Sequence, residues 1–263
     1  MANVASLPIM LKELKLAGFT QHWEELAEKA LDDQWLPQQY LAELCAQETA
    51  VRDHRRLQRY LREAQLPPGK QLSRFDFSDA EGITKQQVTA LIQQPYWAKQ
   101  AENILLFGAS GVGKTHLACG IGYALIDQGY RVKFMTATNI VQNLQNAKES
   151  LRLPEVLARM NKYAVLIIDD IGYVKKDSQE TMVLFELIAH RYESGSVIIT
   201  SNQPFSAWDQ IFEDNMMAVA AIDRLVHHAT ILEIGGESYR MKESVKRRGG
   251  KPIADDRVVN RPS

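Results

Sequence analysis

The run Ile104-Leu105-Leu106-Phe107 leads directly into Gly108-Ala109-Ser110-Gly111-Val112-Gly113-Lys114-Thr115, and the fold class follows from this junction. The second part fits the pattern G-x-x-x-x-G-K-T, in which glycines let successive backbone N–H groups point inward around an anion. The apolar run predicts a strand, and residues 114–128 predict a helix whose N-terminal dipole faces the same anion. Lys114 would contact the β- and γ-phosphates, and Thr115 would ligate Mg²⁺. The junction predicts an ATP site of the P-loop type.

A pair of carboxylates supplies the second part of this predicted site. Asp169 and Asp170 follow the apolar run Val165-Leu166-Ile167-Ile168, which is typical of a strand covered on both faces. In open α/β folds, ligands bind at the carboxyl ends of the strands. Asp169 would therefore hold Mg²⁺ through its water shell, and Asp170 would orient or deprotonate the attacking water. Together with the P-loop, the pair predicts ATP and Mg²⁺ as cofactors.

Strands and helices alternate after residue 101, with short apolar runs at residues 104–107, 131–135, 164–168, 197–200 and 230–234. Helices are expected at 114–128 and 179–192, and a polar helical insertion at about 138–161. This alternation predicts an α/β fold with a parallel five-stranded sheet flanked by helices. We expect a small all-helical N-terminal domain at 1–68, a connector at 69–100, the nucleotide-binding core at 101–238 and a basic tail at 239–263.

The N-terminal domain carries a row of arginines on its predicted second helix, which should run from about residue 38 to 65. They recur at i, i+3, i+4, i+7 and i+10, so they share one face of that helix. Such a row can follow a phosphate backbone, and the same pattern also fits a solvated charged face. The row consists of Arg52, Arg55, Arg56, Arg59 and Arg62.

Two further polar residues follow from the predicted sheet. Asn202 comes after the buried strand at 197–200, where it would hold the lytic water, although an Asn before Pro204 equally suits a turn. Arg224 precedes the last strand. It would serve either as an arginine finger offered to a neighbouring subunit or as a surface ion-pair partner of Asp223 or another nearby acid, and the pattern alone favours the ion pair.

Taken together, the segments 108–115, 165–172, 198–202 and 221–224 resemble the AAA+ ATPases. Within these, the chain looks like the IstB branch, the ATP-binding helper proteins of insertion-sequence transposition, which are related to DnaC-type helicase loaders. The resemblance covers most of the chain and includes the N-terminal helices and the stretch Leu72-Ser73-Arg74-Phe75-Asp76-Phe77.

The resemblance implies roles that spacing alone does not. Asn202 stands where the family has its first sensor residue, and Arg224 where it has a trans-acting arginine finger. The insertion at about 138–162 occupies the place of a helical DNA-contacting element, and it contains Lys148 and Arg152. The resemblance also implies ATP-dependent homo-oligomerisation on double-stranded DNA and handover of a target site to a cognate transposase.

The chain departs from many AAA+ proteins at its end, because 29 residues follow Ile234 and these are too few for a separate C-terminal lid. Arg240 would then replace the second sensor arginine of that lid. Asp170 stands where many AAA+ proteins have glutamate. The shorter carboxylate is expected to slow hydrolysis, which suits a timer better than a motor.

The composition fits a globular protein, with 263 residues, 45% of them hydrophobic, and a net charge of −1. No apolar run is long enough to span a bilayer and no signal segment is apparent, so a cytoplasmic location without membrane contact is expected. The tail from Tyr239 onward has eight Lys/Arg against three Asp/Glu and predicts a basic arm. The leading interpretation is an ATP-hydrolysing helper that assembles on duplex DNA and assists a transposase. The alternatives are a DnaC-like helicase loader, a P-loop kinase of a small metabolite, and an adaptor that binds ATP without hydrolysing it.

Overall fold

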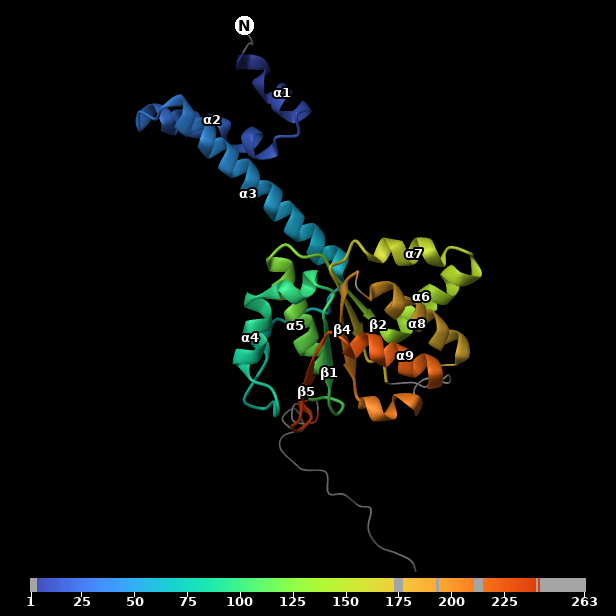
Figure 1. The fold of residues 1–263 in the computed structure, drawn as a ribbon. Helices are drawn as coiled ribbons and strands as arrows, with labels where there is room; N and C mark the ends of the chain where they lie inside the picture. Colours follow the sequence, from blue (N-terminus) through green and yellow to red (C-terminus); the bar gives the residue numbers. More distant parts are fainter. Residues whose placement is uncertain (1–3, 173–176, 193, 211–214, 240, 242–263) are drawn as a thin grey trace, which may run out of the picture. The chain divides into compact units, whose positions relative to one another are not determined.

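The computed structural model describes residues 4–172, 177–192, 194–210, 215–239 and 241 (Figure 1). Its internal contacts divide the chain into two compact units, Met1–Arg62 and Glu63–Ser263. The first unit is helical in its described residues. It contains a 3₁₀ turn at Val4–Ser6 followed by α1 (Leu7–Glu13), α2 (Ala17–Asp32) and most of α3 (Pro37–Ala64). The predicted helical N-terminal region is therefore confirmed.

The first unit is held together by a buried carboxylate at the crossing of α2 and α3. Glu48 on α3 accepts hydrogen bonds from the backbone N–H groups of Gly18 (2.6 Å) and Phe19 (3.4 Å), which lie in the first turn of α2. A side chain at Gly18 would come within 2.5 Å of the Glu48 backbone, so only glycine allows this approach. Glu48 therefore satisfies donors that the helix itself leaves unpaired.

The second unit is built on a parallel sheet in the strand order β2-β3-β4-β1-β5. All five predicted strands are present, each within two residues of its expected bounds. The parallel pairing aligns the carboxyl ends of the strands, so the segments that follow β1, β3 and β4 meet at one edge. The strands are β1 (Asn103–Phe107), β2 (Val132–Thr136), β3 (Val165–Asp169), β4 (Ser196–Ser201) and β5 (Ala229–Glu233).

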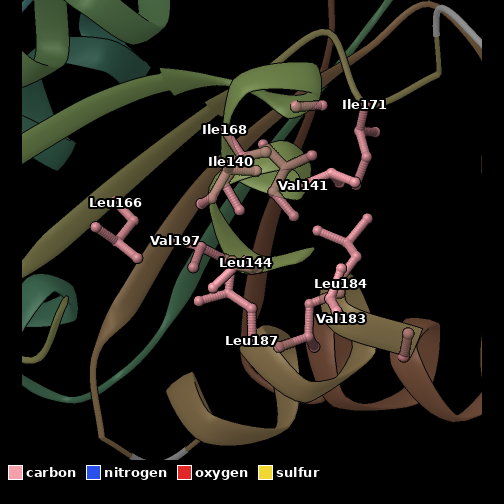
Figure 2. Packing of buried hydrophobic residues seen from close by; sticks show 14 of the residues in the cluster. Ile140, Val141, Leu144, Leu166, Ile168, Ile171, Val183, Leu184, Leu187 and Val197 are labelled. Carbon is pink, nitrogen blue, oxygen red and sulfur yellow. The ribbon is translucent and has the colours of Figure 1, made fainter. Parts of the chain in front are cut away.

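Helices cover both faces of the sheet. One face packs against α5 (Lys114–Asp127), which is accompanied by α4 (Lys85–Gln93) and by the 3₁₀ turns Leu72–Arg74 and Pro95–Lys99. The other face packs against four helices, and Figure 2 shows side chains of Leu166, Ile168 and Val197 meeting those of two of them. These four helices are α6 (Ala137–Glu149), α7 (Leu153–Met160), α8 (Ser178–Arg191) and α9 (Asn215–Val226); a 3₁₀ turn, Phe205–Gln210, precedes α9.

The region predicted as a polar helical insertion is helical, as expected, but it is also part of this core layer. Helix α6 buries Ile140, Val141, Leu144 and Ala147 against the sheet, and Figure 2 labels the first three of them. These positions recur at i, i+1, i+4 and i+7, which is the spacing of one helix face. The many Asn and Gln residues of α6 occupy its exposed side. They make the segment polar on average, so its composition does not show the apolar face.

Candidate nucleotide-binding site

The P-loop runs from the end of β1 to the start of α5, as the sequence predicts. Gly108, Gly111 and Gly113 have φ values of 146°, 89° and 105°, which favour glycine because it has no side chain. The Lys114 ammonium lies 2.8 Å from the carbonyl oxygens of both Gly108 and Ala109. The lysine therefore folds back across the loop and places its charge where the loop amides converge.

A pocket of about 390 Å³ opens over this loop. Its lining combines P-loop residues, polar groups from the ends of β3 and β4, and segments from either end of the second unit. The lining residues are Gly69, Lys70, Arg74, Phe75, Asp76, Asp79, Ala80, Ser110, Gly111, Val112, Gly113, Lys114, Thr115, His116, Asp170, Thr200, Glu237 and Tyr239. The volume suits a small-molecule ligand, and the donors along the loop favour an anionic one.

Asp169 and Asp170 are joined by a hydroxyl group that the sequence did not single out. The Thr200 hydroxyl donates to Asp169 Oδ1 at 2.7 Å and accepts a hydrogen bond from the Asp170 backbone N–H at 2.8 Å. Thr200 is fully buried, so this link is shielded from water. Asp170 has a φ of 66°, a left-handed conformation that costs energy in a residue with a side chain. Thr200 thus fixes the carboxylate that ends β3 and the backbone that follows it.

Asn202 is close to these groups in sequence but does not line the 390 Å³ pocket. Its Oδ1 is buried and makes no hydrogen bond within the described part of the chain. A side chain at Gly172 would lie 2.8 Å from this oxygen, so the loop after β3 approaches Asn202 closely. The unused acceptor is compatible with a bound water or ligand, and a role as the first sensor stays a prediction.

Arg224 lies away from the P-loop of its own chain. Its guanidinium stacks over the Phe185 ring at 5.0 Å and donates to the Ala220 carbonyl oxygen at 3.1 Å. It lines a small cavity with Asn103, the first residue of β1, whereas the P-loop follows the last residue of the same strand. Among the described residues, no ion pair joins Arg224 to Asp223. Any contact of Arg224 with a nucleotide would therefore be with that of another subunit.

The predicted DNA-contacting arginines are all exposed on α3. Arg52 pairs with the buried Glu48 at 2.6 Å, and Arg56 pairs with Asp53 at 3.0 Å. Arg59 lies over the Tyr60 ring, and Arg62 Nε is 3.4 Å from the Gln58 carbonyl oxygen. The row is thus accessible, but Arg52 also belongs to the internal contacts of the first unit.

In the second unit, the two predicted DNA contacts have different surroundings. Lys148 is half-buried and pairs with Glu186 of α8 at 3.2 Å. Arg152 is exposed at the start of α7. Arg240 and most of the basic tail fall outside the residues that the structure describes. The roles predicted for Arg240 and for the tail therefore stay predictions.

The walls of the pocket include residues from outside the P-loop motif. A side chain at Gly113 would come within 2.9 Å of the Phe75 ring, and Phe75 packs edge-to-face on His116. The Tyr239 backbone N–H donates to the Gly111 carbonyl oxygen at 3.1 Å. Phe75 lies in the stretch that carries the family resemblance. Nothing comparable marked Tyr239.

Cys119 lies on α5, one helical turn beyond Thr115, and is fully buried. Burial raises the pKa of its thiol to about 12, with a smaller lowering effect from Lys70 and a raising effect from Asp169. The thiol therefore stays protonated at neutral pH, which excludes thiolate chemistry at this position.

This sheet order, the P-loop after β1 and the carboxylates after β3 define a P-loop protein of the AAA+ class. Matches to known proteins give the family, because the model of the IstB-like ATP-binding proteins matches residues 9–247. The chain belongs to this family. It is 47% identical over 252 residues to an insertion-sequence ATP-binding protein of Sinorhizobium fredii, covering 95% of this chain and 85% of that protein.

A second relative agrees with the family, and two solved structures share the fold. The IS21 ATP-binding protein of Pseudomonas aeruginosa is 38% identical over 259 residues, covering 96% of this chain and 97% of that protein. The DnaI crystal structure has a TM-score of 0.56 at 22% identity and covers 65% of this chain and 95% of that one. Aquifex aeolicus DnaA bound to AMPPCP has a TM-score of 0.55 at 19% identity, covering 70% and 56%. These structures support the fold alone.

Proposed function

We propose that the protein is a Mg²⁺-dependent ATPase that assembles on duplex DNA and assists a transposase, with ATP hydrolysis as the switch. The observation that carries this proposal is the P-loop pocket with the Asp169–Thr200–Asp170 link at its edge. Membership of a family of insertion-sequence ATP-binding proteins supplies the transposition context. In the described part of the chain, no helix combines the length and apolar character needed to cross a membrane.

The residues at the end of the P-loop fit Mg²⁺. Hydroxyl and carboxylate oxygens are the donors that this ion prefers, together with phosphate oxygens and water. Thr115 is the second residue of α5. Asp169 is the last residue of β3, and one of its carboxylate oxygens already accepts a hydrogen bond from Thr200. Its second oxygen would be left for the water shell of the ion. When bound, Mg²⁺ would neutralise charge that develops on the phosphates.

Hydrolysis would then use the neighbouring polar groups of this chain. Lys114 would hold the β- and γ-phosphates, while Asp170, which lines the pocket, would orient the attacking water. Asn202 has a free buried acceptor close to Gly172 and would bind the same water. An aspartate at this place has a shorter reach than glutamate, so we expect slow turnover. DNA is proposed to stimulate it.

Assembly would use Arg224 and the arginine row of the first unit. Because Arg224 lies at the opposite end of β1 from the P-loop, its charge would act on the nucleotide of a neighbouring subunit. ATP would thereby join subunits into a homo-oligomer. The exposed arginines of α3 would contact the phosphate backbone of duplex DNA without reading its sequence.

The test is light scattering of the full chain with ATP, Mg²⁺ and a duplex of defined length. A large complex that requires all three, and that is lost with Lys114→Ala, is the expected result. A complex that also forms with Arg224→Ala would refute the contact in trans. Protein that ignores duplex DNA would instead favour the helicase-loader alternative, which is then tested by co-sedimentation with a replicative helicase.

A further inference from the structure

The nucleotide pocket contains a lysine that lies outside the P-loop motif. Lys70 lines the pocket together with Thr115, Asp170 and Thr200. Its side chain is half-buried, and its ammonium makes no hydrogen bond or ion pair across the residues that the structure describes. A partly buried charge without a partner is unfavourable, because it loses hydration without compensation. A polyanionic ligand in the pocket would supply that partner.

The backbone that carries Lys70 is fixed against the P-loop helix. Pro67 and Pro68 precede it, and both restrict the chain. The chain contacts α5 on either side of Lys70. Before it, the Pro67 carbonyl oxygen is 3.3 Å from the Tyr123 hydroxyl. After it, the Gln71 carbonyl oxygen is 3.0 Å from His116 Nε2, and the Leu72 side chain would lie 2.7 Å from a side chain at Gly120. The position of Lys70 along α5 is therefore set by packing on both sides.

The charge of Lys70 also acts on the buried thiol of Cys119 on α5. Burial is the main cause of the high pKa of this thiol, and the charges of Lys70 and Asp169 both act on it. Cys119 follows Thr115 by one helical turn, so both side chains project from the same side of α5. Lys70 and Asp169 are therefore both within electrostatic range of this part of α5, and Lys70 shares the pocket with Thr115, where the metal is expected.

We propose that Lys70 is a second phosphate-binding lysine, supplied by the same chain, which contacts the triphosphate of bound ATP alongside Lys114. This inference rests on the proposed ATP-binding function. A contact between an ammonium and a phosphate oxygen is a charge-assisted hydrogen bond, which is stronger than a neutral one. Because the segment around Lys70 is held on α5, the backbone that carries the lysine is positioned before the nucleotide arrives.

The experiment measures the affinity of the full chain for a fluorescent ATP analogue and, by competition, for adenosine. Lys70→Met is expected to weaken ATP binding about tenfold and to leave the affinity for adenosine unchanged. Lys85→Met is the matched control, because Lys85 is an exposed lysine of α4 that does not line the pocket. Lys70→Arg should retain most of the affinity, since it keeps the charge. Unchanged thermal melting establishes that the variants fold, and Lys70→Gln replaces Lys70→Met if the latter melts early.

Two results would overturn the proposal. One is a Lys70→Met protein that binds ATP as tightly as the wild type while Lys114→Ala does not bind. The other is an equal loss of ATP and adenosine affinity, which would mean that Lys70 only shapes the pocket. Both leave the proposed ATP-binding function standing. Wild-type protein that binds no ATP would instead refute that function and this inference together.

Discussion

The two units of the chain differ in how completely each buries its own apolar side chains. In the second unit, every residue of β1, β3 and β4 is buried. In the first unit, the buried hydrophobic side chains among the described residues are those of Leu11, Leu26 and Leu44. Its exposed apolar side chains include Val4, Ile9, Met10, Leu14, Leu31, Leu36 and Leu41.

This difference separates a unit that holds a rigid site from one that depends on contacts outside itself. Close packing around the sheet leaves few alternative positions for the residues at the ends of the strands, so Asp169 and Thr200 are preorganised. A small helical unit with few buried apolar side chains is marginally stable, and its exposed apolar side chains are typical of a surface that meets a partner. Chemistry and assembly are thus expected to respond differently to mutation.

The largest effect is expected in the rigid unit, at Asp169. Asp169→Asn removes the negative charge that attracts Mg²⁺ but leaves an oxygen that can accept from Thr200. ATP hydrolysis should fall about a hundredfold or more, whereas nucleotide binding in EDTA and the melting of both units should be unchanged. Steady-state hydrolysis across a Mg²⁺ titration measures this. Hydrolysis close to the wild-type rate at low Mg²⁺ would show that Asp169 is not the metal-directed carboxylate.

The parts of this unit that the sequence predicts are those with a local signal. A short, fully apolar run such as Val165–Ile168 marks a buried strand, and the carboxylate after it then lies at the ligand-binding edge. The glycines of the P-loop likewise reflect backbone angles that favour glycine. Such features depend on neighbours in the chain, which a single sequence displays.

Other parts depend on residues that the fold brings together from distant segments. Arg191 is buried, and no carboxylate pairs with it among the residues that the structure describes. It donates to the carbonyl oxygens of Tyr163 and Ala164 at 3.0 Å and of Ser196 at 2.9 Å. Burial lowers its pKa to about 10. Its acceptors are backbone groups just before β3 and at the first residue of β4, so no side-chain pattern predicts them. The same holds for Thr200, whose partners lie 30 and 31 residues away.

The next largest effect is expected in the first unit, at Glu48. Glu48→Ala would leave the amides of Gly18 and Phe19 and the charge of Arg52 without their partner, a loss of about 1–3 kcal/mol. Glu48→Gln keeps an acceptor and should cost less. Chemical denaturation of the full chain, followed by hydrogen exchange at the backbone amides of α2, would report this unit. Equal destabilisation of the nucleotide site would mean that the two units unfold together.

The pH dependence of this unit has a defined sign. Burial alone would raise the pKa of Glu48, but the hydrogen bonds from Arg52 and from the two amides outweigh it, and the pKa is lowered. A lowered folded-state pKa stabilises the protein fully above the unfolded value of about 4.3, and the effect disappears as the pH falls through the folded-state pKa. The wild-type unit should therefore lose stability on acidification below that value. The Glu48→Gln protein should lose less stability than the wild type over the same pH range.

An intermediate effect is expected at Thr200, where the rigid unit depends on one hydroxyl. Thr200→Val keeps the shape but removes both hydrogen bonds, leaving the Asp170 amide and Asp169 Oδ1 without this partner. Turnover should fall about tenfold with a smaller change in ATP affinity, and Thr200→Ser should recover most of it. Single-turnover hydrolysis separates the two effects. A change in affinity alone would assign Thr200 to binding rather than to positioning the carboxylates.

The smallest effects are expected for single arginines of α3, and they distinguish DNA contact from internal support. Arg55→Ala and Arg59→Ala should each weaken duplex binding about threefold and reduce its dependence on the logarithm of salt by about one, without changing stability. Arg52→Ala should also lower the stability of the first unit, because Arg52 pairs with Glu48 at 2.6 Å. Fluorescence anisotropy at several salt concentrations measures the first effect and denaturation the second. If Arg55→Ala and Arg59→Ala left both the affinity for duplex DNA and its salt slope unchanged, the arginine row would be a solvated face. The exposed apolar side chains of α1 and α2 would then be the better candidates for contacts of this unit with a partner.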